Sequence, residues 1–317
     1  MIAFGPVPSR RLGRSLGVNN IPVKICTYSC VYCQIGRTLK IQVDREKFYS
    51  PDEVFREVKE KVEDIKRKGE ALDYITFVPD GEPTLDLNLG KEILLVKSLG
   101  FKVAVITNSS LIDRENLASE LKLADLVSLK LDAVSEEMWR RVDRPARGLV
   151  YRDILEGMVR FRKEFEGEVI TETMFVEELN DDRKEIDKIA GFLSELKPDR
   201  AYIAVPTRPP AERWVKPAGE RALASAYAAF SEALGPERVE FLVGFEGEEF
   251  VSTGDPVEDL LGITSVHPMR EDALETYLRE NRLSFEAVRK LIEEGKLLEL
   301  EYGGHRFYMR KLPTRKW

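Results

Sequence analysis

The chain has very few cysteines and histidines. Only Cys26, Cys30 and Cys33 occur among its 317 residues, and its two histidines, His267 and His305, lie far from them in sequence. A structural zinc site normally closes its shell with four protein ligands, and no fourth cysteine exists to complete one. The odd cysteine count, without a segment resembling a signal peptide, argues against a disulfide framework. We therefore expect a protein of a reducing compartment.

Long apolar runs and an excess of positive charge are also missing. No apolar stretch approaches the roughly 20 residues that cross a bilayer, so we expect a soluble, cytoplasmic protein with no membrane partner. The formal net charge of −7 argues against a generally basic nucleic-acid binder, although a local basic patch is compatible with it. Charged residues make up 33% of the chain, and this density with little cysteine fits a thermophile.

Short apolar runs alternate with amphipathic segments over the first 235 residues. Ser50 and Pro51 form a helix start, and Gly69 and Gly100 stand where helix C-terminal caps belong. Strands separated by helices of this length predict parallel pairing with right-handed crossovers. The predicted strands are Ser15–Val18, Tyr74–Val78, Lys102–Ile106, Leu126–Leu131, Val169–Met174 and Tyr202–Val205. The predicted helices are Pro51–Lys68, Leu87–Leu99, Arg114–Leu121, Ser135–Arg141, Tyr151–Phe165, Asp182–Leu196 and Gly219–Leu234.

The pattern changes beyond Pro236. An edge hairpin is predicted there, followed by a turn into a linker; the segments are Val239–Val243, Glu249–Ser252 and Gly254-Asp255-Pro256. Two helices and then a β-hairpin with a Gly-Gly turn follow; they are Arg270–Glu280, Ser284–Glu294, Leu297–Tyr302 and His305–Arg310. Two helices before a two-stranded wing resemble a small winged-helix domain. The predicted division is 1–235, 236–263 and 264–317.

The three cysteines stand in the run CTYSCVYC, with the spacing C-x3-C-x2-C. Thiolates favour soft metals, and three of them suit an iron–sulfur cluster that keeps one iron open. A zinc site, a plain electron-transfer cluster and packing in the core are the alternatives. Three cysteines within eight residues, beside Tyr28 and Tyr32 and nowhere else, are hard to explain as core packing.

This motif, with Tyr32 before the last cysteine, resembles the radical S-adenosylmethionine (radical SAM) superfamily. The resemblance implies a [4Fe-4S] cluster on Cys26, Cys30 and Cys33, whose fourth iron takes the amino and carboxylate groups of S-adenosylmethionine. It implies an electron donor as a partner and a cofactor contact for Tyr32. It also implies an α/β fold with an open, partial (β/α)6 barrel, which the six predicted βα units match.

Further site residues are expected in the loops after the strands, because ligands of parallel α/β barrels gather at the carboxyl ends of the strands. Residues 79–85 read Pro-Asp-Gly-Glu-Pro-Thr-Leu and resemble the family's GGEP motif, which binds the methionyl amino group of the cofactor. The resemblance implies cofactor contacts for Asp80, Gly81 and Glu82. Asp80 replaces the first glycine of the motif, and a turn with a helix cap is the alternative.

Polar residues also follow or end the later strands. Asn108 and Ser109 follow the third strand, where they either contact the cofactor or cap the next helix. Thr173, near the end of the fifth strand, is a weaker candidate for lining the adenine pocket.

The fourth strand carries Ser128, Lys130 and Asp132, which alternate and therefore share one face. An inward face would direct them at the cofactor or the substrate. Together with the later Arg144-Pro145, the pattern resembles the archaeal wyosine-synthase-like branch of the superfamily. Lys130 is the candidate catalytic residue, and a purely structural Lys–Asp pair is the alternative.

An arginine-rich segment precedes the cysteine loop. The start Pro-Ser-Arg-Arg-Leu-Gly at residues 8–13 resembles a group of predicted Fe–S oxidoreductases related to the wyosine synthases. Arg10, Arg11 and Arg14 are candidates to bind a phosphate or carboxylate of the substrate, since guanidinium forks match those anions. Surface ion pairs in an acidic protein are the alternative.

The cysteine count limits the reaction. One cluster uses all three thiolates, so no auxiliary cluster can be built from cysteine. The wyosine synthases bind a second cluster through additional N-terminal cysteines, which this chain lacks, so the resemblance covers the scaffold and not the reaction. A hydrogen-atom donor would have to be a tyrosine such as Tyr28 or Tyr32, the solvent or regenerated S-adenosylmethionine.

The C-terminal tail is basic. No acidic residue follows Glu301, whereas basic and aromatic side chains accumulate: Tyr302, Arg306, Phe307, Tyr308, Arg310, Lys311, Arg315, Lys316 and Trp317. This composition predicts a surface that contacts nucleic acid. Recognition of a protein substrate and packing against the barrel are the alternatives.

The motifs together give one leading hypothesis. The chain is a radical SAM enzyme that cleaves S-adenosylmethionine at a single [4Fe-4S] cluster to a 5′-deoxyadenosyl radical, which abstracts hydrogen from a substrate. A tRNA base is the first candidate substrate, and a peptide or protein is the second. The alternative from another class is a non-enzymatic metal-cluster regulator that binds nucleic acid through the winged helix.

Overall fold

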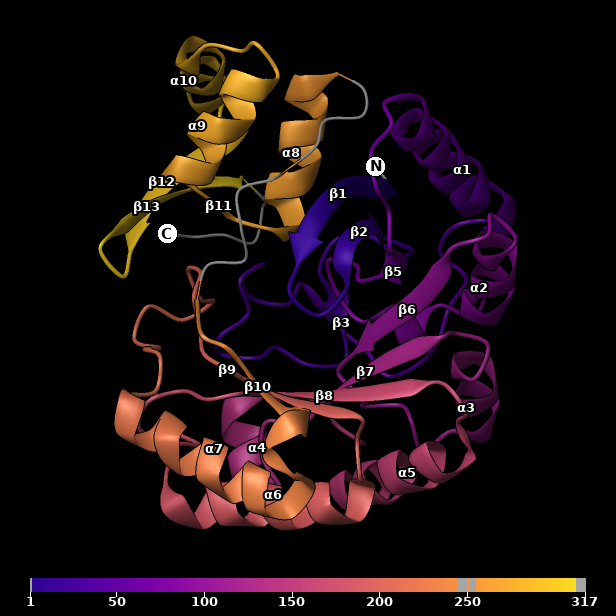
Figure 1. The fold of residues 1–317 in the computed structure, drawn as a ribbon, viewed down its shortest axis with the longest axis vertical. Helices are drawn as coiled ribbons and strands as arrows, with labels where there is room; N and C mark the ends of the chain where they lie inside the picture. The colour runs from indigo at the N-terminus through magenta and orange to yellow at the C-terminus, as the bar shows by residue number, and fades with distance from the viewer. Residues whose placement is uncertain (1, 245–249, 251–254, 312–317) are drawn as a thin grey trace.

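A curled sheet of eight strands forms the centre of the computed structural model, which describes residues 2–244, 250 and 255–311 (Figure 1). The strand order is β1-β2-β5-β6-β7-β8-β9-β10. β1 is antiparallel to β2, and every other neighbouring pair is parallel. The strands are β1 Ala3–Ser9, β2 Gly13–Val18, β5 Tyr74–Phe77, β6 Lys102–Thr107, β7 Leu126–Lys130, β8 Glu168–Met174, β9 Arg200–Ala204 and β10 Val239–Leu242.

Helices surround the convex side of this sheet (Figure 1). They are α1 Pro51–Arg67, α2 Leu89–Lys97, α3 Glu115–Leu121, α4 Glu136–Val142, α5 Tyr151–Glu164, α6 Arg183–Leu196 and α7 Glu220–Leu234. The predicted start of α1 is confirmed, because the Ser50 hydroxyl accepts a hydrogen bond from the Glu53 amide at 3.1 Å. The predicted C-terminal glycines are confirmed as well, since Gly69 and Gly100 have φ angles of 70° and 84°. All six predicted strands and all seven predicted helices are present and differ only at their ends.

Two strands flank the predicted set. The first strand of the predicted edge hairpin is confirmed, because Val239–Leu242 pairs parallel to β9 as β10. Helix α7 supplies the crossover that returns the chain in the same direction. The other half of that hairpin, Glu249–Ser252, lies outside the described residues except for Phe250. The opposite edge is β1, whose prolines and glycine hide a strand pattern and are tolerated at an edge.

Alternate residues of each strand face the two sides of the sheet. Val127 and Leu129 of β7 pack under the helices, in the main core. Leu126 of β7 and Ile170 of β8 belong instead to a second cluster on the concave side. Lys130 and Glu172 fall in the same alternation as Leu126 and Ile170, so the inner side receives their charged groups.

The C-terminal unit consists of α8 Pro256–Val266, β11 Met269–Arg270, α9 Glu271–Glu280, α10 Phe285–Glu293, β12 Leu297–Tyr302 and β13 His305–Arg310. Its strands form a sheet of order β11-β13-β12. The two predicted helices and the hairpin are confirmed, and Gly303 and Gly304 have the positive φ angles of a tight hairpin turn. The winged-helix classification stays a prediction.

Residues 256–263, which the sequence predicts as a linker, belong to helix α8. The Asp255 carboxylate caps this helix by accepting the amides of Val257 and Glu258. Asp255-Pro256 is thus a helix start, although the same two residues also fit a turn. Leu260 and Ile263 pack in the core of the C-terminal unit, so the predicted boundary after residue 263 falls inside one packed element.

Polar contacts join the C-terminal unit to the barrel. Asp259 of α8 pairs with Lys61 of α1 at 2.5 Å, and the Tyr302 hydroxyl donates to the Pro206 carbonyl after β9 at 2.9 Å. α8 lies beside β1, and Tyr302 of β12 contacts the loop after β9. The unit therefore bridges the two opposite edge regions of the curled sheet (Figure 1). Among the described residues, no helix is long and apolar enough to span a membrane.

Candidate functional site

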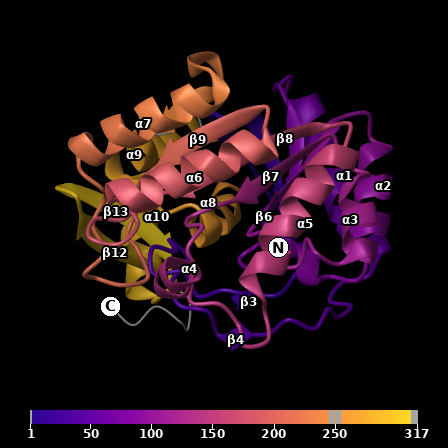
Figure 2. The ribbon, with the colours of Figure 1, turned by 90° about the horizontal axis from the view of Figure 1, so that it is seen from below.

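The cysteine loop follows β2 and contains two very short parallel strands, β3 Ile25–Cys26 and β4 Lys40–Ile41. Figure 2 shows them together with α4 at one end of the barrel. Backbone hydrogen bonds tie the loop to the end of α4, from the Ser29 amide to the Asp143 carbonyl at 3.0 Å and from the Val31 amide to the Val142 carbonyl at 2.9 Å. All three cysteines are free thiols and partly exposed.

Hydrogen-bond donors lie beside the sulfurs of Cys33 and Cys26, whereas the Cys30 thiol donates to the Asp143 carboxylate at 3.2 Å. The Lys24 ammonium lies 3.4 Å from the Cys33 sulfur and donates to the Gly36 carbonyl at 2.5 Å. The Asn108 amide nitrogen lies 3.5 Å from the Cys26 sulfur. Burial, assisted by the charge of Glu82, raises the pKa of the Cys26 thiol to about 12. This thiol therefore stays neutral until a metal replaces its proton.

The loop of residues 79–85 packs directly on the cysteine loop. The Lys24 amide donates to the Asp80 carbonyl at 2.8 Å, and the Glu82 amide donates to the Ile25 carbonyl at 3.1 Å. A Cβ on Gly81 would lie 1.9 Å from the Ile25 carbonyl oxygen, so only glycine permits this approach. Asp80, in place of the motif's first glycine, is buried and accepts a long hydrogen bond from Asn19.

The Glu82 carboxylate joins the loop after β5 to the end of β6. It accepts from the hydroxyls of Thr84 and Thr107 at 2.6 Å each and from the Asn108 amide at 2.8 Å. Asn108 in turn donates to the Thr27 hydroxyl at 2.7 Å, which links this network to the cysteine loop. Ser109 is buried beside it, with its hydroxyl 3.4 Å from the Lys130 carbonyl. Both the cofactor role and the capping role predicted for these residues are compatible with this arrangement.

The face that Ser128, Lys130 and Asp132 share is the concave one. The Tyr32 hydroxyl donates to Asp132, and the Lys130 ammonium lies 5.1 Å from the centre of the Tyr32 ring. Burial lowers the pKa of Lys130, but the carboxylates of Glu172 and Asp132 outweigh burial and raise it above its ordinary value. Lys130 is therefore held as an ammonium at neutral pH.

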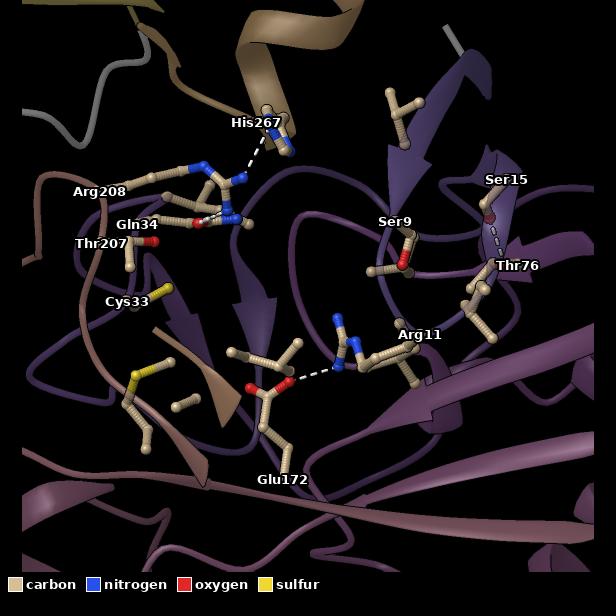
Figure 3. Close-up of a pocket in the computed structure, with 18 of the residues that line it drawn as sticks. Ser9, Arg11, Ser15, Cys33, Gln34, Thr76, Glu172, Thr207, Arg208 and His267 are labelled. Atoms are coloured by element: carbon tan, nitrogen blue, oxygen red, sulfur yellow. Dashed lines mark hydrogen bonds and ion pairs between the residues drawn. The ribbon is translucent and has the colours of Figure 1, made fainter. Parts of the chain in front are cut away.

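A cavity of about 310 Å³ occupies the concave side of the sheet (Figure 3). Tyr32 and Cys33 line it at one end, so the cysteine loop opens into it. Lys130, Glu172 and Arg11 line its polar part. Side chains from the cysteine loop, the β1–β2 turn and the neighbouring strands β7 and β8 thus meet in one space.

Glu172 is a site residue that the sequence did not single out. Its two carboxylate oxygens pair with Lys130, at 2.5 Å, and with Arg11. Although burial favours the neutral form, these two cations lower the pKa of Glu172 to about 2. Glu172 lies in the strand Glu168–Met174, and its position in the alternation of that strand is only a weak sequence signal that its carboxylate faces inward.

The structure brings only one of the three predicted arginines into the cavity. Arg11 lines it, whereas Arg10 donates to the Phe241 carbonyl at 3.2 Å and Arg14 pairs with Glu70. Arg10 and Arg14 lie outside the cavity because successive residues of the β1–β2 turn point to different sides, and a substrate role for these two stays a prediction. Thr173 also misses the cavity, since its hydroxyl donates to the Leu131 carbonyl at 2.8 Å on the other face of β8.

Three unpredicted residues meet at the mouth of the cavity. Arg208, after β9, donates to the Gln34 side-chain oxygen at 3.1 Å and lies 2.8 Å from the His267 Nε2 atom (Figure 3). Arginine can only donate, so Nε2 of His267 is the acceptor in this pair. His267 ends α8 and comes from far along the chain, which is why no local pattern predicts it.

Comparison with known families decides the identity of this site. Residues 20–190, more than half of the chain, match the model of the Radical SAM superfamily. The chain belongs to the radical SAM superfamily. It is also 47% identical to a UPF0026 protein of Methanocaldococcus jannaschii, over 99% of this chain and 97% of the relative.

Solved radical SAM structures share the fold. A structure of TYW1 with a lysine–pyruvate adduct bound superposes with a TM-score of 0.55 at 16% identity, over 71% of this chain and 76% of that one. SuiB of Streptococcus suis bound to precursor peptide SuiA gives a TM-score of 0.52 at 15% identity, over 71% and 48%. The resemblance that the cysteine motif carries is confirmed, and so is the partial barrel.

Members of the radical SAM superfamily are enzymes that use a [4Fe-4S] cluster and S-adenosylmethionine, so the regulator alternative is set aside. Among the described residues, no three His, Cys, Asp or Glu side chains converge on one ion. That finding concerns a single ion, whereas each thiolate of a four-iron cluster binds a separate iron. Three accessible thiols with Lys24 and Asn108 beside their sulfurs fit such a cluster.

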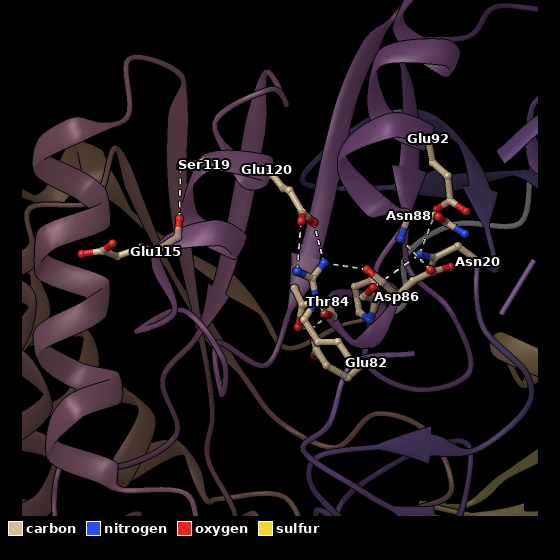
Figure 4. Close-up of polar contacts among 11 residues, drawn as sticks. Asn20, Glu82, Thr84, Asp86, Asn88, Glu92, Glu115, Ser119 and Glu120 are labelled. Carbon is tan, nitrogen blue, oxygen red and sulfur yellow. Dashed lines mark hydrogen bonds and ion pairs between the residues drawn. The ribbon is translucent and has the colours of Figure 1, made fainter. Parts of the chain in front are cut away.

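A buried pair of carboxylate side chains lies next to the loop of residues 79–85 (Figure 4). Glu92 of α2 and Asp86 are both fully buried, and Asn20 donates to Glu92 at 3.2 Å. Burial, together with the charge of Asp86, raises the pKa of Glu92 to about 9, and burial raises that of Asp86 to about 6. At neutral pH Glu92 is therefore protonated.

Gly81→Ala is expected to separate the two loops of the site. The added Cβ overlaps the Ile25 carbonyl, so the backbone must shift, at a cost of about 1–3 kcal/mol in the free energy of unfolding. We also expect less iron to be retained after anaerobic reconstitution. Urea unfolding and iron analysis measure both effects. Gly191→Ala is the control, since its Cβ meets nothing within 4 Å in α6. Wild-type stability and iron content in Gly81→Ala would contradict the packing argument.

Glu92→Gln is expected to flatten the pH dependence of stability. The folded chain keeps a proton on Glu92 up to about pH 9, whereas an unfolded glutamate loses it near pH ~4.3. The wild-type free energy of unfolding therefore falls as the pH rises between these values, by up to about 1.4 kcal/mol per unit. The amide of Gln does not titrate, so the variant avoids this loss. In urea titrations its free energy of unfolding, relative to that of the wild type, should therefore rise from pH 6 to pH 9. The exposed Glu60→Gln is the control, and parallel profiles for all three proteins would refute the assignment.

Proposed function

We propose that this chain cleaves S-adenosylmethionine at one [4Fe-4S] cluster on Cys26, Cys30 and Cys33 and directs the resulting radical at a substrate in the barrel cavity. The observation that supports it is the opening of the cysteine loop into that cavity, which Cys33 and Tyr32 line. When bound, the reduced cluster and its cofactor supply a 5′-deoxyadenosyl radical that abstracts a hydrogen atom. An external electron donor is the necessary partner.

The chain's own residues position the reactants. Lys24 places a positive charge beside the Cys33 sulfur, where it offsets the negative charge of three thiolates. Glu82 and Asn108 hold the loops on either side of the cysteines, which fixes the surface that the cofactor meets. Tyr32 and Asp132 form the wall between the cysteine loop and the cavity. These contacts supply orientation, and the radical chemistry is the cofactor's.

Lys130 acts in this proposal as a fixed positive charge. The TYW1 structure contains a lysine–pyruvate adduct. An amine must lose its proton to form such an adduct, whereas the Glu172 and Asp132 carboxylates favour the charged form of Lys130. The ammonium therefore binds the cofactor or the substrate by hydrogen bonding and charge, without covalent chemistry.

The sequence predicts a tRNA base as the first candidate substrate and a peptide or protein as the second. Two aromatic residues of the predicted nucleic-acid surface are not available for contact, because Phe307 and Tyr308 are 3% and 0% exposed. Tyr302 packs against the barrel through its hydrogen bond to Pro206. Arg315, Lys316 and Trp317, which belong to the same prediction, lie outside the described residues.

Anaerobic reconstitution tests the proposed function. We expect about four irons and four sulfides per chain, and 5′-deoxyadenosine with methionine after addition of dithionite and S-adenosylmethionine. Each of the variants Cys26→Ala, Cys30→Ala and Cys33→Ala should lose the cluster absorbance and both products, with circular dichroism checking the fold. A wild-type protein that binds only zinc, or that carries the cluster but yields no 5′-deoxyadenosine, would disprove it.

A further inference from the structure

We infer that the barrel cavity binds a small organic anion, with a carboxylate or phosphate group and an apolar body, and that Arg11 recognises the anionic group. The inference rests on the proposed function, because it names the substrate class of that site. It follows from the charges that line the cavity, from the way Arg11 reaches them and from the cover over the mouth.

Positive charge exceeds negative charge in the cavity. Arg11, Lys130 and Arg208 line it, and Glu172 is the one carboxylate among the lining residues of the described chain. Glu172 divides its two oxygens between Arg11 and Lys130, and the Asp132 carboxylate also acts on Lys130, so two carboxylates face the three cations. The side chains of Arg11, Lys130 and Glu172 are only 12–19% exposed. Excess charge in so sheltered a place is costly, and an anion offsets that cost.

The β1–β2 turn is built to carry Arg11 inward. Leu12, the next residue, is 3% exposed and packs in the concave cluster with Leu126 and Ile170. This anchor holds the turn so that the Arg11 guanidinium reaches Glu172 of β8, across the cavity from β2 (Figure 3). A planar guanidinium matches the paired oxygens of a carboxylate or phosphate. Arg10 remains outside, at the Phe241 carbonyl, and provides a neighbouring arginine for comparison.

The rest of the lining is apolar. Phe4, Leu12, Val78, Ile106 and Leu242 supply carbon surface beside the charged groups. A ligand that fills the cavity therefore has an apolar body next to its anionic group. Such a body also offers the C–H bonds that hydrogen abstraction requires.

The cover over the mouth favours a small molecule over a macromolecule. Arg208 joins Gln34 of the cysteine loop to His267 of α8, and Tyr302 fastens the C-terminal unit to Pro206. The enclosed volume of about 310 Å³ lies at the lower end of the range of small-molecule sites. A base on a folded tRNA would have to displace this cover.

Calorimetry with three probes of the same size tests the inference on the cluster-loaded protein with S-adenosylmethionine present. Benzoate and phenyl phosphate carry the two anionic groups, and neutral benzamide has the same ring. We expect at least one anion to bind about 10-fold more tightly than benzamide, and the better anion identifies the substrate group. Arg11→Gln should weaken that anion by about 10-fold or more and leave benzamide unchanged. The matched control Arg10→Gln should bind like wild type.

The inference is overturned if neither anion binds more tightly than benzamide, or if Arg10→Gln and Arg11→Gln lose the same affinity. It is also overturned if the anion binds only to the cluster-free protein, because the cations would then be a counter-charge for the cluster. Binding of bulk tRNA that Arg11→Gln abolishes would overturn it as well. If thermal melting shows that Arg11→Gln does not fold, Arg208→Gln takes its place with the same expectations. If the wild-type protein cleaves S-adenosylmethionine but binds no anion, only this inference is wrong and the proposed function stands. If it binds an anion but does not cleave S-adenosylmethionine, the proposed function is wrong.

Discussion

The contact between the loop after β5 and the cysteine loop is the constraint on which the rest of the site depends. Gly81 lies so close to the Ile25 carbonyl that no side chain fits between them. Reciprocal backbone hydrogen bonds, between Lys24 and Asp80 and between Glu82 and Ile25, lock the two loops together. The cysteine loop has almost no regular structure of its own, so this contact and the one to α4 fix where its sulfurs lie.

A second constraint organises the interior of the barrel. Glu172 holds Arg11 and Lys130 at the same place, and Lys130 in turn lies over the Tyr32 ring beside the cysteines. The charges of the cavity are thereby coupled to the wall of the cluster site. The C-terminal unit also contributes to the cavity, because its His267 contacts Arg208 there. This unit is therefore part of the site.

Much of the fold was predictable because its signals are local. Ser50 before Pro51, the glycines after the helices and the Gly303-Gly304 turn each specify a backbone geometry within a few residues. The failures have the opposite origin. The strand with which Val239–Leu242 pairs depends on how α7 packs, and Asp255-Pro256 fits a turn as well as a helix start. Neither choice is settled by neighbouring residues alone.

The sequence by itself determined the metal chemistry of this protein, because three cysteines within eight residues must lie near one another in any compact fold. It also determined the alternating strands and helices that form the barrel, since period and caps are properties of short segments. Only the tertiary structure decided which charged residues share the cavity. Arg11 faces inward and Arg10 and Arg14 do not, and Glu172 and His267 join it from distant segments. The direction of each side chain depends on the packing of strands and helices that are far apart in sequence, and no local pattern contains that information.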